Sequence, residues 1–218
     1  MPFEVTVAEL RDAVQAALSR SGRRFAHGVR VFNSLERRED HAPVSWAYVA
    51  EKIGMETATL ETAYPDWVGL LDRARQREIE LWPPTDGALD DDTAEWFFAF
   101  IDALDSSETG VVACYWLGNE PGGLPQSSVV TAVGEDYLAV VGDLDDVKRY
   151  HSGHLLGELR PGIFPEFMWA LDGSWASVLD KDTPWCDVGY DGRIVNAVEA
   201  PPGGVVDLAH GVRRLDLS

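Results

Sequence analysis

The chain has 218 residues, 45% of them apolar, and a formal net charge of −19. This length and composition suit one large or two small globular domains with an ordinary core. The N-terminus carries acids where a signal peptide would carry bases, and no apolar run reaches the roughly 18 residues that a membrane span requires. We therefore expect a soluble, cytoplasmic protein that does not contact the membrane.

The acidic charge belongs to the C-terminal part of the chain. Residues 1–84 carry 11 Lys and Arg against 13 Asp and Glu, whereas the rest carries 7 against 24. A surface with such an excess of acids repels phosphate backbones and speeds association with a basic partner. A solvated surface without a partner is the alternative explanation.

The N-terminal residues predict helices. Thr6 and Glu9 form a capping box, and apolar residues follow at helical spacing as far as Gly22. Residues 25–38 predict a second helix, which the polar residues before Pro43 break. This is also the only basic region of the chain, with Arg20, Arg23, Arg24, Arg30, Arg37 and Arg38. We interpret these arginines as a solvated helix face.

A helix-turn-helix pattern follows. Ser45 caps a predicted helix over the residues WAYVAEKIG, and another helix begins near Asp66. Such a motif needs a small residue at the helix contact, Gly at the turn and apolar residues beyond it. Those positions hold Ala50, Gly54, Met55 and Leu60.

The segment from Gly54 through Tyr64-Pro65-Asp66 to Leu71 resembles the DNA-reading unit of the TetR repressor family. The positions that would contact DNA, however, hold Glu56, Thr57, Glu61, Thr62 and Ala63 in place of Lys, Tyr and His. Two carboxylates on the reading helix oppose phosphate. We therefore expect this unit to serve as a scaffold, with DNA binding as the disfavoured alternative.

The residues Trp82-Pro83-Pro84-Thr85-Asp86-Gly87 predict a linker, and three aspartates follow at positions 90–92. We place a domain boundary here, between a helical domain over residues 1–84 and an acidic domain over residues 90–218. The expected fold class is α+β. A helical, helix-turn-helix-like N-terminal domain is followed by a small domain with an antiparallel sheet and few helices.

The acidic domain is predicted to open with a helix capped by Asp92 or Thr93. Its apolar stripe consists of Trp96, Phe97, Phe100, Ile101 and Leu104. From Gly110 onward the pattern becomes β-rich. The predicted elements are a central strand over 111–117, a hairpin of 128–133 with 137–141, a helix that opens with acids at Asp143, a helix over 191–200 and a strand over 205–208.

The stretch from Phe164 to Tyr190 holds three of the eight Trp and five carboxylates. Asp172-Gly173 predicts a hairpin turn between strands over 166–171 and 174–180, and a third strand follows over 185–188. With a two-residue turn, Trp169 opposes Ala176 and Ala170 opposes Trp175. The two Trp then lie on opposite faces of the sheet.

The conspicuous residues of this stretch are Pro165, Trp169, Asp172, Trp175, Asp182, Trp185 and Val188-Gly189. They resemble the recurrent pattern of a group of uncharacterised actinobacterial proteins, in which a tryptophan-rich strand leads through an Asp-containing turn to Trp, Asp and Val-Gly-Gly. The resemblance covers residues 112–198, and Tyr190 replaces the second Gly. It implies a fold and no activity. The small α+β layout is similar to that of bacterial immunity and antitoxin proteins.

If a helix layer covers only one face of this sheet, one Trp ring is left in solvent beside carboxylates. An aromatic and acidic patch of this kind anchors basic partners. The predicted partner-binding residues are Trp169, Trp175, Asp180, Asp182, Trp185 and Asp187. The alternative is that both faces are covered and both rings of the hairpin are core residues.

No pattern in the sequence indicates a catalytic residue, a metal or a cofactor. Cys114 and Cys186 are far apart and in apolar surroundings, which favours reduced core thiols. His151 and His154 have a spacing found in metal sites but no second ligand pair, which favours a loop. The acids between residues 180 and 191 lack the central Gly and terminal Glu of a calcium loop, and no hydrolase or phosphate-binding motif occurs.

We therefore expect a non-enzymatic protein-binding module of the bacterial immunity or defence-associated kind, whose acidic domain engages a basic protein partner. The alternative is a transcription regulator that binds DNA through the N-terminal unit and senses a ligand through the acidic domain. A hydrolytic enzyme is a third hypothesis, without named catalytic residues.

Overall fold

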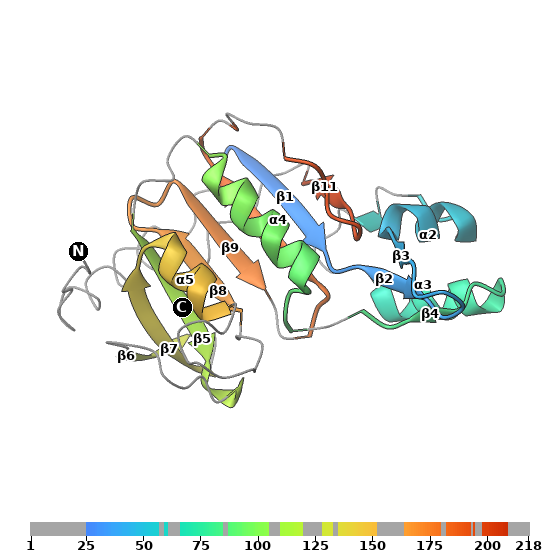
Figure 1. Ribbon diagram of the computed structural model, residues 1–218, viewed down its shortest axis with the longest axis horizontal. Helices are drawn as coiled ribbons and strands as arrows, with labels where there is room; N and C mark the ends of the chain where they lie inside the picture. Colours follow the sequence, from blue (N-terminus) through green and yellow to red (C-terminus); the bar gives the residue numbers. More distant parts are fainter. Residues whose placement is uncertain are drawn as a thin grey trace.

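The computed structural model describes residues 25–56, 59–60, 66–84, 87–104, 110–119, 128–132, 135–151, 164–179, 182–192, 194 and 198–208. Its main feature is an antiparallel sheet of eight strands, and a second sheet of three strands lies at one end of it (Figure 1). Four short α-helices accompany the two sheets in these residues.

The large sheet has the strand order β11-β1-β10-β9-β8-β5-β7-β6, and every neighbouring pair is antiparallel. In chain order the strands are β1 (His27–Phe32), β5 (Val111–Trp116), β6 (Ser128–Ala132), β7 (Glu135–Gly142), β8 (Phe167–Ala170), β9 (Trp175–Leu179), β10 (Trp185–Tyr190) and β11 (Val205–Asp207). The aromatic stretch from Phe164 to Tyr190 supplies β8, β9 and β10 and so forms the middle of the sheet.

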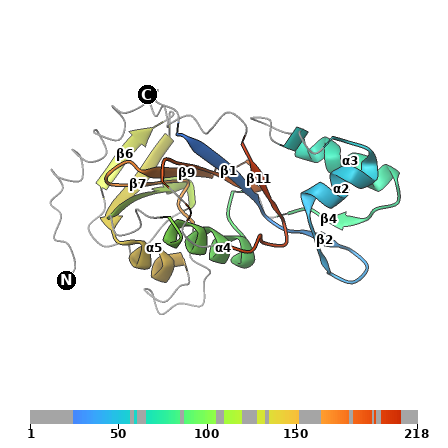
Figure 2. The same cartoon turned by 90° about the horizontal axis from the view of Figure 1, so that it is seen from above.

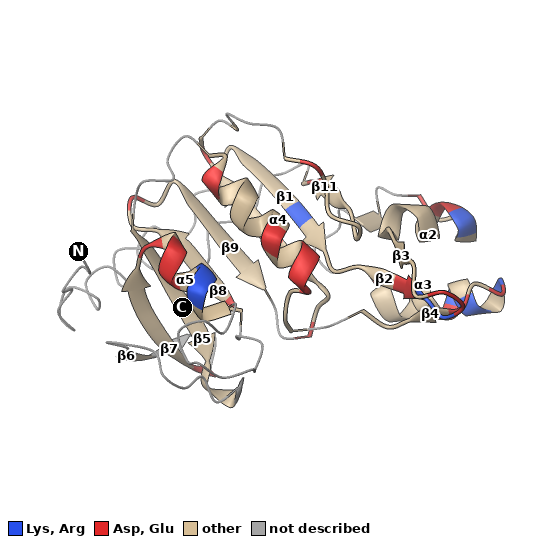
Figure 3. Cartoon of the chain, viewed as in Figure 1, with Lys and Arg blue, Asp and Glu red and all other residues tan. Residues whose placement is uncertain are grey.

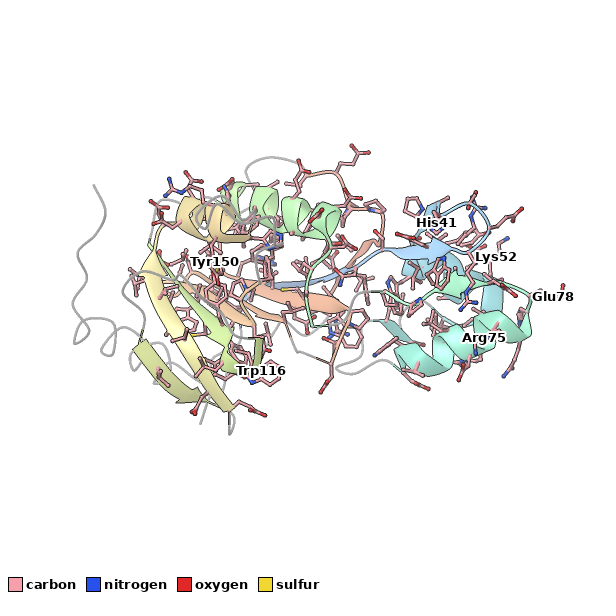
Figure 4. The ribbon with its side chains drawn as sticks, turned by 60° about the horizontal axis from the view of Figure 1, so that its bottom comes forward. His41, Lys52, Arg75, Glu78, Trp116 and Tyr150 are labelled. Carbon is pink, nitrogen blue, oxygen red and sulfur yellow. The ribbon has the colours of Figure 1, made fainter. Side chains whose placement is uncertain are left out.

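Two helices cover one face of the large sheet, α4 (Asp91–Asp102) and α5 (Leu144–His151) (Figure 2). The Asp90 carboxylate accepts a hydrogen bond from the Thr93 N–H at 2.8 Å and so caps α4. The inner side of α4 is apolar and packs with side chains of the sheet in one core cluster, which includes Phe97, Ile101, Val31, Met168, Trp175 and Cys186. Tyr150 of α5 lies between that helix and the sheet, with its ring edge-on to Tyr115 at 5.0 Å (Figure 4).

The opposite face of the large sheet is buried as well. Its cluster consists of Phe25, Val112, Cys114, Tyr137, Ala139, Phe167, Trp169 and Ala176. Successive residues of a strand point to opposite faces. A strand that is covered on both faces is therefore apolar throughout, as the four residues Phe167-Met168-Trp169-Ala170 of β8 are.

The small sheet has the order β3-β2-β4, with β2 (Leu35–Arg37), β3 (Pro43–Val44) and β4 (Leu81–Trp82). Helices α2 (Trp46–Ile53) and α3 (Trp67–Gln76) pack with it, and we call residues 35–82 the small subdomain. Ser45 and Asp66 cap the two helices, and Gly54, at φ 70°, ends α2. The shared core includes Leu35, Val44, Leu81, Val49, Ile53 and Leu70.

The small subdomain is joined to the large sheet by a common core. Phe32 at the end of β1 and Trp185 at the start of β10 belong to the same cluster as the small-subdomain side chains. The ring of Phe32 stacks on Trp46 at 5.3 Å, and the Trp46 indole N–H donates to the Asn33 carbonyl at 2.8 Å. The start of α2 is thereby attached to the chain that leaves β1.

Most elements predicted between residues 90 and 208 are confirmed. The helix with the Trp96 stripe, the central strand, the β6–β7 hairpin, the helix α5 and the last strand are all present. The predicted cap of the Trp96 helix, Asp92 or Thr93, is wrong, because Asp90 caps it and the helix begins at Asp91. The predicted register of the β8–β9 hairpin is also right, because Trp169 pairs with Ala176. Only Gly173 of the turn has a positive φ, 74°, and its N–H donates to the Ala170 carbonyl at 2.8 Å. This is a different turn from the predicted one.

The predicted fold class, with a helical N-terminal domain, is wrong. Residues 25–38, predicted as a helix, form β1 and β2. β1 lies between β11 and β10, so the large sheet contains a strand from the N-terminal part of the chain. Valines at 29 and 31 alternate with Arg30, and this period-2 pattern is that of a strand. The predicted helix over residues 6–22 lies outside the described residues.

Two further predictions are affected in different ways. In the predicted helix over 191–200, the described residues are not helical, and Ile194 forms an isolated antiparallel bridge with Leu104. The reading helix of the helix-turn-helix pattern lies mostly outside the described residues, although α2 and α3, which flank it, are present. None of the described helices is long and apolar enough to cross a membrane.

Candidate functional site

The six residues predicted to bind a partner do not form an exposed aromatic patch. Trp169, Trp175 and Trp185 are only 4%, 1% and 4% exposed. Trp169 lies on the sheet face away from the helices and Trp175 on the face beneath α4, so both rings of the hairpin are core residues. Asp182 is exposed, and Asp180 lies outside the described residues. None of these three tryptophans is therefore available as an anchor for a partner.

The sixth residue, Asp187, is part of a buried ion pair with Arg30. The two face each other across β1 and β10, and the guanidinium Nε and Nη2 donate to the two carboxylate oxygens at 2.6 and 2.8 Å. Nη1 donates to the Leu60 carbonyl at 3.2 Å, and the guanidinium lies 4.8 Å from the centre of the Trp185 ring. Arg30 is 1% exposed. The bidentate pair joins β1 to β10, and the hydrogen bond to Leu60 attaches the small subdomain, so Arg30 has a structural role.

A second buried polar contact joins β7 to the residue that precedes β8. The Tyr137 hydroxyl donates to Glu166 Oε2 at 3.2 Å, and Glu166 is only 4% exposed. Burial, together with the nearby Glu166 carboxylate, raises the pKa of Tyr137. The phenol therefore stays protonated and serves as a donor. The ring of Phe167 packs edge-on against Tyr137 at 5.2 Å, which keeps the donor in place.

The outer surface of α4 and α5 is strongly acidic (Figure 3). We call it the acidic helix layer, and its carboxylates are Asp91, Asp92, Glu95, Asp102, Asp143, Asp145 and Asp146. The two cations on it, Lys148 and Arg149, are both in ion pairs, Lys148 with Asp102 at 2.7 Å and Arg149 with Asp146. Partial burial lowers the pKa of Lys148, but hydrogen bonds to Asp102 and Asp145 raise it overall.

Physical chemistry explains where these acids lie. The inner sides of both helices are apolar, so charged residues are confined to the outer sides. Acids in the first turn of each helix are favourable because of the helix dipole. Glu95 and Asp102 lie beyond the first turn, and so the dipole does not account for them. The layer is a predominantly negative surface on two helices, which the Lys148–Asp102 ion pair joins.

One exposed aromatic residue was missed by the sequence analysis. Trp82, which was assigned to a linker, is in β4 and 43% exposed. It pairs with Glu36 of β2, which is 46 positions earlier. A two-residue strand before two prolines gives no local signal, and only the pairing with β2 identifies it as one.

The remaining candidate sites have structural explanations. Within the residues that the structure describes, no group of three His, Cys, Asp or Glu side chains could hold a metal ion. Cys114 and Cys186 are free and buried, and burial raises the pKa of Cys114 to about 12. His151, at the end of α5, packs against Phe98 and Phe164, and His154 lies outside the described residues.

No family model matches the chain, and neither a curated protein nor a solved structure matches it.

Proposed function

We propose that the protein is a non-enzymatic binding module that engages a basic protein partner through the acidic helix layer. The observation that supports this best is the distribution of charge: seven carboxylates on α4, α5 and the residue before α5 face two cations, both already in ion pairs. Such a surface attracts a positively charged protein and steers its approach.

The support beneath the layer favours binding over a merely solvated surface. The apolar side of α4 carries Trp96, Phe97, Phe100 and Ile101, all at most 7% exposed, so the helix is fixed to the sheet. A fixed surface loses little conformational freedom when a partner docks. The acids of α4 are therefore presented in one arrangement.

The test is capture of partners from the native host by the whole protein. A triple variant, Asp91→Asn with Asp92→Asn and Glu95→Gln, removes three negative charges from the layer. We expect it to lose the captured basic protein, and the wild-type complex to weaken as ionic strength rises.

The matched control removes the same charge elsewhere, by Glu51→Gln, Glu56→Gln and Asp72→Asn on the exposed side of the small subdomain. It should retain the partner. Equal loss in both variants would show unspecific attraction, and equal retention in both would show that the layer is not the binding surface; either result contradicts the proposal.

The regulator hypothesis has narrower support. Helices α2 and α3 and the Gly54 turn occur as the helix-turn-helix pattern predicts. In the small subdomain, however, ten acids accompany six Lys and Arg, and a negative surface opposes a phosphate backbone. We expect weak or no sequence-specific DNA binding. A binding-site selection at physiological salt that enriched a defined palindrome would reverse this order of hypotheses.

A further inference from the structure

The small sheet has one covered and one open face. Leu35, Val44 and Leu81, which alternate with the open-face residues, are buried against α2 and α3. On the other face Pro43, Glu36 and Trp82 form one row across β3, β2 and β4, because Glu36 pairs with both. All three are exposed. We call this row, together with the neighbouring Arg38 and His41, the Trp82 face.

The Trp82 side chain is held in one position although 43% of it is exposed. The Arg38 guanidinium lies 4.5 Å from the centre of the indole, and Arg38 Nε also donates to the Leu81 carbonyl at 3.2 Å. The imidazole of His41 stacks on Trp82 at 6.4 Å with an interplanar angle of 16°, and its Nδ1 lies 3.3 Å from Glu36 Oε2. An indole that is already ordered loses little entropy on binding, and Trp is among the residues most often found at binding hot spots.

The surroundings of this indole are acidic. Glu36, Glu39, Asp40, Glu78 and Glu80 are exposed on β2, its turn and the segment before β4. Three arginines accompany them: Arg37 is paired with Asp40 at 2.8 Å, Arg38 lies against the indole, and Arg77 donates to the Lys52 carbonyl at 2.9 Å. Figure 4 shows that His41 and Glu78 both belong to the small subdomain, far from Trp116 of the large sheet and Tyr150 of α5. The carboxylates around the Trp82 indole therefore give this surface a negative charge that complements a cationic segment.

We propose that the Trp82 face is a second contact surface for the basic partner and takes an arginine- or lysine-rich segment, with the indole of Trp82 as its anchor. The premise that the partner is basic rests on the proposed function, but the Trp82 face is a separate surface from the acidic helix layer. The exposed part of the indole contacts the apolar stems and the cationic heads of the segment. The carboxylates of Glu36, Glu78 and Glu80 then pair with its remaining charges.

The test is a nuclear magnetic resonance titration of the whole, isotope-labelled protein with a short peptide that alternates arginine and serine. We expect the Trp82 indole signal and the amide signals of β2 and β4 to shift in a saturable manner. Trp82→Ala should weaken this binding about tenfold or more, whereas Trp82→Phe should keep most of it. The matched control is Leu171→Ala, which truncates an apolar side chain of similar exposure, 41%, at the hairpin of the large sheet and should change nothing.

Three results would overturn the inference: no response of Trp82 to the peptide, equal binding by Trp82→Ala, or a response only to the matching glutamate peptide or to a single-stranded oligonucleotide. The melting temperature of Trp82→Ala, expected to stay near that of the wild type, excludes misfolding as the cause of a loss. If the peptide does not bind at Trp82 while the triple variant of the acidic helix layer still loses its partner, this inference fails and the proposed function stands. If Trp82 responds to the peptide but the triple variant keeps its partner, the Trp82 face remains a contact surface and the proposed role of the acidic helix layer fails.

Discussion

The large sheet buries Trp169 and Trp175 on opposite faces, whereas the small sheet leaves 43% of Trp82 exposed. Trp175 lies beneath α4 and Trp169 on the opposite face, and each is at most 4% exposed. In the small sheet, helices α2 and α3 pack with the face that carries Leu35 and Leu81, and the face with Trp82 is open. The same residue type is thus a core residue in one region and a candidate contact in the other. A tryptophan is a core residue where both faces of its sheet are covered, and it is an exposed residue where only one face is covered.

Removal of β1 should have the largest effect on this comparison. A fragment of residues 90–218 retains both faces of the hairpin but lacks the strand between β10 and β11. It also lacks Arg30, so Asp187 has no cation, and Val29 and Val31 are missing from the core. We expect no cooperative thermal transition by circular dichroism, in contrast to the whole chain. A cooperative melt with strand signal would instead support a domain that begins at residue 90.

Truncation of one tryptophan in each region tests the comparison directly. Trp175→Ala removes a fully buried ring, and we expect it to lower the free energy of unfolding by about 3–5 kcal/mol. Trp82→Ala removes a ring that is 43% exposed and should cost less than about 1 kcal/mol. Urea unfolding curves of the two variants measure both values. Similar losses would mean that the Trp82 face is part of a core.

The buried ion pair should be the next most sensitive feature. Arg30→Met leaves Asp187 without its cation, and we expect a loss of about 3 kcal/mol, at the low end for buried pairs because the Asp187 side chain is 23% exposed. A double variant, Arg30→Met with Asp187→Leu, should recover part of this loss because no unpaired charge remains. Urea unfolding of the two single variants and the double variant gives the coupling. If the losses of unfolding free energy in the two single variants add up to the loss in the double variant, Arg30 and Asp187 do not stabilise each other.

Alkaline pH should destabilise the large sheet by a smaller amount. Burial raises the pKa of Cys114 from 9.0 to about 12, and it also raises the pKa of Cys186, which is on the other face of the sheet. The native thiols keep their protons where the unfolded chain releases them. Stability is therefore full below about pH 9 and falls as pH rises toward about 12 because of Cys114, by up to about 1.4 kcal/mol per pH unit, and Cys186 adds a decline in the same direction. Cys114→Ala should show a shallower decline in urea unfolding at increasing pH; an unchanged slope would show that this thiol is not enclosed.

Local patterns were sufficient for the hairpin at the centre of the large sheet. Asp172-Gly173 marks the turn, and the residues around it fix which side chains share a face, so the pairing of Trp169 with Ala176 follows from the sequence. The stripe of α4 is equally local, because its apolar residues repeat at helical spacing. Elements of this kind can be predicted from the pattern of roughly a dozen consecutive residues.

The features that sequence analysis missed depend on distant partners. Arg30 was assigned to a solvated helix face, whereas it is a buried strand residue that pairs with Asp187, 157 positions away. Trp82 was assigned to a linker because a strand of two residues gives no local signal. Its pairing with Glu36, which identifies the strand, is visible only in the structure. The acidic excess of the C-terminal part was visible in the composition, but its concentration on α4 and α5 required the helix layer. Long-range pairing is the information that one sequence does not supply.

The place of β1 in the sheet has a consequence for how the protein is made. A ribosome releases β1 long before β10, its neighbour, because Arg30 and Asp187 are 157 positions apart. Until then the strand has no partner, and its unpaired edge is open to other chains. Closing a loop of this length must precede the contacts that reward it, which slows folding in proteins rich in non-local pairing. The nascent chain therefore exposes the edge of β1 until β10 has been synthesised.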